Sequence, residues 1–211
     1  MVRIVVTSDT HNKHNDIQVP EADVFVHCGD ATISSTRNEM EGFARWINHL
    51  PHRVKLFCGG NHDWELFNYK HEQFISLFDS SVDYITVGSV EVAGVKIFGC
   101  GMPGAWEAIP TGVDVLFTHY PCLDILDEIP AFSKFNKSAH IVNAGNRALY
   151  HEVTSRIKPR YHLAGHIHED GGKQKDLFYG DGTKTTFINA AMLDENYQLA
   201  RQPIVFDIEN E

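Results

Sequence analysis

The sequence predicts an α/β protein in which two mixed β-sheets are flanked by helices. Two features of the chain order lead to this prediction. Strand and helix patterns alternate in the first half, as in β-α-β units, and hairpin patterns follow in the second half. The composition agrees, because 211 residues that are 43% hydrophobic and 22% charged are typical of a globular protein. This length fits one domain over residues 1–211.

The first half of the chain contains three short apolar runs that predict buried strands, at residues 2–6, 23–27 and 53–58. Residues 36–50 predict a helix, since Thr36 and Glu39 have the spacing of a capping box and Pro51 prevents its continuation. Apolar residues recur along one face of this helix at intervals of one to four, at Met40, Phe43, Ala44, Ile47 and Leu50. A second helix is expected near residues 70–78.

The second half is richer in turns. Residues 89–98 predict a β-hairpin around Gly94, and a later hairpin turns at residues 180–182. The remaining predicted elements are strands at 113–117, 161–164 and 203–208 and a helix at 146–157. Residues 122–145 are the least regular part, and we expect them to form a rim or lid over a site.

The charge balance limits the possible partners. The net charge of −10 argues against binding to duplex nucleic acid, which requires a basic face. It still permits a small phosphorylated substrate, because bound metal ions can supply positive charge. The sequence contains no run of about 18 apolar residues and no signal-peptide pattern, so we expect a cytoplasmic protein without membrane partners. The four cysteines have no CxxC spacing and are expected to be buried.

Five polar clusters follow predicted strands, at the ends where α/β proteins place ligand sites. They are Asp9-Thr10-His11, Gly29-Asp30, Gly59-Gly60-Asn61-His62-Asp63, Thr118-His119 and Gly165-His166-Ile167-His168. Each cluster alone is also compatible with a turn or a helix cap. Turn chemistry alone does not readily explain five of them, all at strand ends.

These clusters supply seven candidate metal ligands, namely Asp9, His11, Asp30, Asn61, His119, His166 and His168. All are oxygen or imidazole donors, which suit Mn, Fe, Zn or Ni better than a structural zinc site. Seven ligands are too many for one catalytic metal that keeps an open position. They fit two ions about 3.5–4 Å apart that share one carboxylate.

The order DxH, GD, GNHD, TH, GHxH resembles the calcineurin-like metallophosphoesterase superfamily over nearly the whole chain. The segments LPHRVKLFCGGNHD, GHIHE and QPIVFDIEN resemble its small foetal-brain/adult-brain subgroup, whose members act on phosphodiesters including cyclic nucleotides. The resemblance implies a four-layer α/β/β/α sandwich and two divalent transition-metal ions, with Mn²⁺ expected first. It also implies a metal-dependent phosphodiesterase in which a bridging hydroxide is the nucleophile.

Carried over by motif, the resemblance gives each candidate a role. One metal is held by Asp9, His11, Asp30 and His168, and the other by Asp30, Asn61, His119 and His166. The resemblance makes Asp30 the bridging ligand. His62 is then placed to protonate the leaving oxygen or to stabilise charge on the phosphate, and Asp63 either orients an imidazole or stabilises the turn. Asn61, His62 and Tyr120 are the expected substrate contacts, and Trp64, Trp106, Tyr120 and Phe135 are candidates for stacking on a base.

The chain departs from the superfamily pattern at two places. Ile33 stands three residues after Asp30, where an acid or amide is common, and Cys122 replaces a proline after Tyr120-Pro121. Two rival functions stay open. The same centre also serves a phosphomonoesterase or protein phosphatase, and a non-catalytic interaction scaffold could keep the fold.

Overall fold

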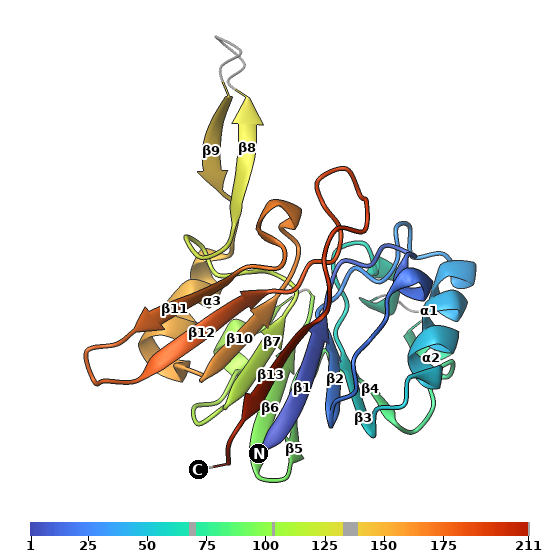
Figure 1. The fold of residues 1–211 in the computed structure, drawn as a ribbon, viewed down its shortest axis with the longest axis horizontal. Coiled ribbons are helices and arrows are strands. Elements are labelled where there is room, and N and C mark those ends of the chain that lie inside the picture. Colours follow the sequence, from blue (N-terminus) through green and yellow to red (C-terminus); the bar gives the residue numbers. More distant parts are fainter. Residues whose placement is uncertain (68–70, 103, 133–138, 211) are drawn as a thin grey trace.

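The computed structural model describes residues 1–67, 71–102, 104–132 and 139–210. Its first sheet has the strand order β13-β1-β2-β3-β4. The strands are β1 (Val2–Thr7), β2 (Val24–His27), β3 (Val54–Phe57), β4 (Val82–Tyr84) and β13 (Ile204–Ile208). Neighbouring strands are parallel except β13, which runs antiparallel to β1 (Figure 1).

The second sheet has the order β11-β12-β10-β7-β6-β5. Its strands are β5 (Val87–Val92), β6 (Val95–Cys100), β7 (Val115–Thr118), β10 (Tyr161–Ala164), β11 (Gln174–Phe178) and β12 (Lys184–Asn189). The four central strands are parallel, and the hairpin partners β5 and β11 are antiparallel at the two edges. Both predicted hairpins are confirmed, and the prediction of two mixed sheets is correct.

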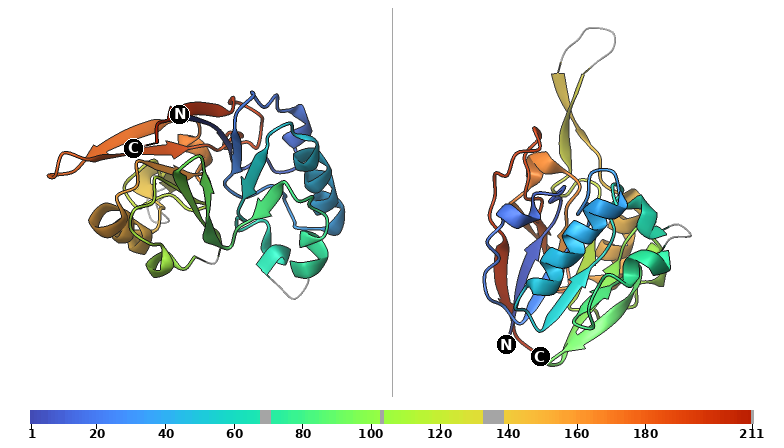
Figure 2. Two further views of the ribbon diagram at one scale, coloured as in Figure 1. Left: turned by 90° about the horizontal axis from the view of Figure 1, so that it is seen from below. Right: turned by 90° about the vertical axis from the view of Figure 1, so that its right-hand side faces the viewer.

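Alternating side chains divide the interior into layers. In β1, Ile4 and Val6 join the core between the two sheets, whereas Val5 packs in the core beneath the first helix. The helix α1 (Arg37–His49) covers the outer face of the first sheet, and α3 (Arg147–Glu152) covers that of the second (Figure 2). This arrangement confirms the expected α/β/β/α sandwich.

The helices α2 and α3 are shorter than the sequence predicts. α1 matches its prediction closely, with the capping box between Thr36 and Glu39 present. α2 covers only His71–Ile75, and residues 68–70 lie outside the described residues. α3 ends at Glu152 and continues as one π-helical turn over Val153–Ile157, whose apolar side chains pack on the second sheet. Short 3₁₀ turns occupy His14–Asp16, Trp64–Phe67, Trp106–Ala108 and His168–Asp170.

The segment 122–145 has regular structure that its sequence did not indicate. It contains an antiparallel hairpin of β8 (Glu128–Phe132) and β9 (Ala139–Asn143), which projects from the body on the side of the parallel strand ends (Figure 1). The sequence did not predict these two strands, and the role of the segment as a rim or lid stays a prediction. Among the described residues, no helix is long and apolar enough to cross a membrane.

Candidate metal centre

The polar clusters converge where the carboxyl ends of both sheets meet. β1, β2 and β3 deliver ligands from the first sheet, and β7 and β10 deliver them from the second. Four of these residues have left-handed backbones, with φ of 52° at Asp9, 38° at His11, 55° at Asp30 and 69° at His166. Non-glycine residues rarely adopt this conformation, and it concentrates at functional sites. These left-handed residues let the chain turn abruptly at the end of each strand.

The structure brings the seven candidate ligands into two adjoining groups. Asp9, His11 and His168 form one group, and Asp30, His119 and His166 form the other, with ligand atoms within 4.8 Å of one another in each. A third overlapping group joins Asp30 to His11 and His62. Asn61 belongs with the second group, because its Oδ1 lies 2.9 Å from His119 Nε2.

Asp30 lies between the two groups. Its Oδ2 is 3.8 Å from His11 Nε2 on one side and 3.5 Å from His119 Nε2 on the other. The separation of these two imidazoles from one carboxylate oxygen exceeds a hydrogen bond but suits ligands of neighbouring cations. Asp30 therefore lies near ligand residues of both groups, and its role as a shared ligand stays a prediction.

Backbone carbonyls fix the orientation of three ligand imidazoles. His11 Nδ1 lies 2.9 Å from Thr32 O, His119 Nδ1 lies 2.9 Å from Cys28 O, and His168 Nδ1 lies 2.9 Å from Asp194 O. A carbonyl only accepts hydrogen bonds, so each Nδ1 must donate and each Nε2 is directed to the site. Metal-binding histidines are typically held in this way.

Two buried ligand atoms test whether a metal fits. Asp9 Oδ1 and His11 Nε2 are buried and have no hydrogen-bond partner among the described residues. Unpaired buried polar atoms are rare and destabilising, and each calls for an explanation. Around His119, both ring nitrogens face acceptor oxygens, those of Cys28 and Asn61. The donor set therefore fits cations that would give these atoms partners.

Glycines allow the ligand loops to approach closely. A Cβ on Gly60 would lie 2.1 Å from Asp30 Oδ1, and one on Gly165 would lie 2.1 Å from Asp9 Oδ2. Both distances are well below van der Waals contact. The glycines in GGNHD and GHIH are thus required by the packing of the two carboxylates.

The buried charges oppose one another. Burial raises the pKa of Asp30, but the attraction of His119 outweighs it and leaves the pKa below its ordinary value. Burial lowers the pKa of His119, yet the charge of Asp30 raises it to about 9. Burial and the charge of His119 lower the pKa of His166 to about 4, so His166 is neutral and able to donate its lone pair.

Asp63 connects two ligand loops. Its carboxylate accepts hydrogen bonds from the N–H groups of Ala31, Thr32 and Gly60 and from the Thr32 hydroxyl, at 2.8–3.1 Å. These described hydrogen bonds of the carboxylate involve no imidazole. The structure thus favours the turn-stabilising alternative for Asp63. Its carboxylate is buried and is not part of the described pocket lining. Burial, together with the charge of Asp30, raises its pKa to about 6.

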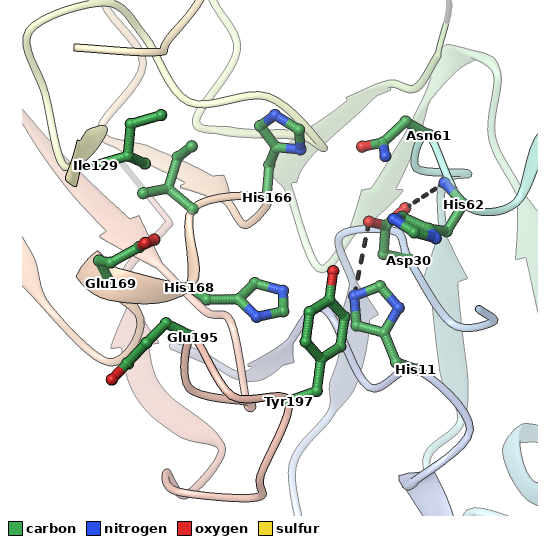
Figure 3. A pocket seen from close by; sticks show the side chains of 11 residues that line it. His11, Asp30, Asn61, His62, Ile129, His166, His168, Glu169, Glu195 and Tyr197 are labelled. Atoms are coloured by element: carbon green, nitrogen blue, oxygen red, sulfur yellow. Dashed lines mark hydrogen bonds and ion pairs between the residues drawn. The ribbon is translucent and has the colours of Figure 1, made fainter. Parts of the chain in front are cut away.

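His11, Asp30, His166 and His168 of the two groups line a cavity of about 210 Å³ (Figure 3). Two of the predicted substrate contacts, Asn61 and His62, also line it. His62 is held by two bonds: its Nδ1 lies 2.7 Å from Ile33 O, and its backbone N–H donates to Asp30 Oδ1 at 2.8 Å. Tyr120 instead packs against His166, with ring centroids 4.4 Å apart, and does not contribute to the described lining.

The sequence did not identify the opposite wall, which consists of Ile129, Glu169, Glu195 and Tyr197 (Figure 3). Of the aromatic stacking candidates, Trp106 is buried in the core of the second sheet, and Trp64 is exposed but absent from the described lining. Phe135 lies outside the described residues. The segment that carries Glu195 and Tyr197 has only one recognisable feature in the sequence, the polar turn Asp194-Glu195-Asn196-Tyr197.

A sandwich of two mixed sheets with carboxylates and imidazoles at their common edge defines the class, that of metal-dependent hydrolases. Comparison with known proteins makes the assignment specific. Residues 2–170 match the family model described as calcineurin-like phosphoesterase. The chain therefore belongs to the calcineurin-like phosphoesterase family, and it is a metal-dependent phosphoesterase.

Relatives agree over almost the whole chain. Metallophosphoesterase domain-containing protein 1 from Homo sapiens is 32% identical over 98% of this chain and 71% of its own length. The UPF0046 protein C25E10.12 from Caenorhabditis elegans is 33% identical over 98% of this chain and 81% of its own. The crystal structure of TT1561 from Thermus thermophilus shares the fold, with a TM-score of 0.53, 15% identity and 98% coverage of both chains.

Proposed function

We propose that this chain is a phosphodiesterase that hydrolyses small phosphodiesters with two divalent transition-metal ions sharing Asp30. The observation that carries the proposal is the presence of a ligand group on each side of that carboxylate. The oxygen and imidazole donors suit Mn²⁺, Fe, Zn or Ni, of which we expect Mn²⁺. When bound, two such cations activate water near neutral pH and offset negative charge on the phosphoryl oxygens.

His62 supplies the proton in this proposal. The Ile33 carbonyl fixes its Nδ1–H, and so directs Nε2 towards the ligand atoms of His11 and Asp30. The water oxygen forms a bond to phosphorus, and the bond from phosphorus to one alcohol oxygen breaks. The protonated Nε2 gives its proton to that departing oxygen, while the proton of the water passes to solvent. The products are an alcohol and a phosphomonoester.

The charge and size of the pocket favour a small diester over a monoester. The described lining contains two glutamates, Glu169 and Glu195, and neither lysine nor arginine. A diester carries one negative charge, whereas a monoester carries close to two at neutral pH and would meet stronger repulsion from this wall. The volume of about 210 Å³ is small for a ligand pocket, which favours compact substrates. Cyclic nucleotides are among the diesters to test.

The rival functions predict different properties. A phosphomonoesterase or protein phosphatase would use the same ligands and prefer a monoester. A non-catalytic scaffold has no physical need for buried polar atoms that lack a hydrogen-bond partner among the described residues, such as Asp9 Oδ1 and His11 Nε2. Those atoms support an enzyme over a scaffold.

The test is hydrolysis of a chromogenic phosphodiester and of the matching monoester, each with Mn²⁺ and with a chelator. The proposal expects metal-dependent diester turnover that exceeds monoester turnover, followed by activity on a panel of cyclic nucleotides and other small diesters. Turnover of the monoester alone would identify the protein as a phosphatase. Metal binding without turnover of any substrate would favour the scaffold.

The proposed partner is the small diester itself, with no nucleic-acid duplex and no membrane. We place the protein in the cytoplasm, where thiols stay reduced. All four cysteines, Cys28, Cys58, Cys100 and Cys122, are free and buried, which supports a reducing compartment.

A further inference from the structure

A short segment between β12 and β13 closes the pocket on the side opposite His62. We call residues 194–198 the strap. Asp194 organises it, since its backbone N–H donates to Gln198 O at 2.9 Å and its Oδ1 accepts from the N–H groups of Asn196 and Gln198. Lys13 Nζ donates to Tyr197 O and so ties the strap to the loop after His11. The strap is therefore a fixed wall.

One oxygen couples the strap to the metal ligands. Asp194 O lies 2.9 Å from His168 Nδ1 and also accepts from the backbone N–H of Tyr197 at 2.9 Å. The Tyr197 ring then packs against both His11 and His168, with centroid distances of 4.9 Å to each. Tyr197 has a left-handed φ of 58°, a strained conformation that the strap holds in place.

The Tyr197 hydroxyl faces the pocket. Its side chain lines the pocket, and the residue is 44% exposed. Within the described part of the chain, no group hydrogen-bonds to the hydroxyl. Figure 3 shows the hydroxyl end of the ring directed towards the middle of the pocket, beyond His11 and His168. The position beside the metal ligands is where a phosphoryl group must sit.

The need for such a donor follows from the lining. Because no described lining residue is lysine or arginine, hydrogen-bond donors to the phosphoryl group must come from other side chains of the lining. Asn61 and His62 approach from one wall, and Tyr197 approaches from the other. A phenol with an ordinary pKa near 10 is protonated at neutral pH and can donate one hydrogen bond.

We propose that Tyr197 is a substrate-binding residue whose hydroxyl donates a hydrogen bond to a non-bridging phosphoryl oxygen of the diester. The inference rests on the proposed function and adds to it the residue that holds the phosphoryl group opposite His62. The ring orients the hydroxyl through His11 and His168, and the strap fixes the ring.

The test compares Tyr197→Phe with the wild type, since this change removes the hydroxyl and keeps the ring. With Mn²⁺ and a chromogenic diester, kcat/KM should fall about 10- to 100-fold, as expected for loss of one hydrogen bond to a charged group. Bound metal should stay unchanged, and calorimetry should show about tenfold weaker binding of inorganic phosphate to the metal-loaded protein. Tyr161→Phe is the matched control, because Tyr161 stacks on Phe206 at the start of β10, away from the ligands.

Three results would overturn the inference. Unchanged kcat/KM and unchanged phosphate binding in Tyr197→Phe would show that the hydroxyl is not used. Loss of one metal in this variant would instead assign the residue to positioning His168, and an equal loss in Tyr161→Phe would make the effect nonspecific. If the wild type hydrolyses no ester, the proposed function fails, and phosphate binding alone then decides the role of Tyr197.

Discussion

At the scale of single residues, the site depends on imidazoles that backbone carbonyls orient. The carbonyls of Thr32, Cys28 and Asp194 each engage Nδ1 of one imidazole and direct its Nε2 into the site. His62 follows the same pattern through Ile33 O. His62 lies half-buried on the pocket wall beside Asp30.

This position gives a prediction for His62→Ala. Removing a general acid should lower kcat for the diester about 100- to 10,000-fold, while bound metal remains as in the wild type. The bound metal is measured by metal analysis after chelator treatment and reloading with Mn²⁺. Because His62 also belongs to a group with His11 and Asp30, loss of an ion in the variant would identify it as a ligand and contradict its proposed role.

At the scale of elements, the ligands come from the ends of parallel strands, and glycines let the following turns approach one another. At Gly60, a Cβ would lie 2.1 Å from Asp30 Oδ1 and 2.7 Å from His119 Cε1. Gly180, in the turn between β11 and β12, has no atom within 4 Å of its would-be Cβ. The two glycines form a matched pair for mutation.

Gly60→Ala should therefore displace the Asn61 turn from Asp30 and His119. We expect loss of one bound ion, at least an about 100-fold decrease in diester turnover, and a stability decrease of about 1–3 kcal/mol from overpacking. Gly180→Ala should stay within about twofold of the wild type in turnover. Full turnover with two ions in Gly60→Ala would show that the turn accommodates a side chain and that our account of its packing is wrong.

Sequence patterns predicted the elements that local chemistry specifies. The capping box of Thr36, the hairpin at Gly94 and the five strand-end clusters are all short-range signals. The strap escaped prediction because Tyr197 reaches the site only through the path of the chain between β12 and β13. The hairpin β8–β9 escaped because its two strands lack a clear alternating pattern.

At the scale of the whole molecule, each ligand group draws residues from both sheets, so the site requires the complete sandwich. A buried relay supports the contribution of the second sheet. His162 Nε2 lies 2.9 Å from Thr118 Oγ1, and the Thr118 hydroxyl donates to Tyr120 O at 2.6 Å. Since Thr118 donates onwards, His162 must donate to it. This relay fixes the chain on both sides of His119.

Burial lowers the pKa of His162 to about 3, which makes stability depend on pH. The unfolded chain binds a proton near pH 6.5 and the folded one does not, so this contribution to stability is complete above pH 6.5 and is lost as the pH falls towards 3. Between pH 7.5 and pH 5 the loss should be about 2 kcal/mol. Urea unfolding in the presence of a chelator measures this loss. Between pH 7.5 and pH 5, the free energy of unfolding of His162→Gln should decrease by about 2 kcal/mol less than that of the wild type. Identical pH dependence in both proteins would refute the assignment.

The central claim is a phosphodiesterase centre in which two ions share Asp30. Titration of chelator-treated protein with Mn²⁺, following bound ions and diester turnover together, tests it most directly. We predict that turnover rises with the second equivalent and reaches its maximum at two ions per chain, and that Asp30→Ala binds neither ion firmly and is inactive. Full turnover at one ion per chain, or two firmly bound ions in Asp30→Ala, would contradict the account.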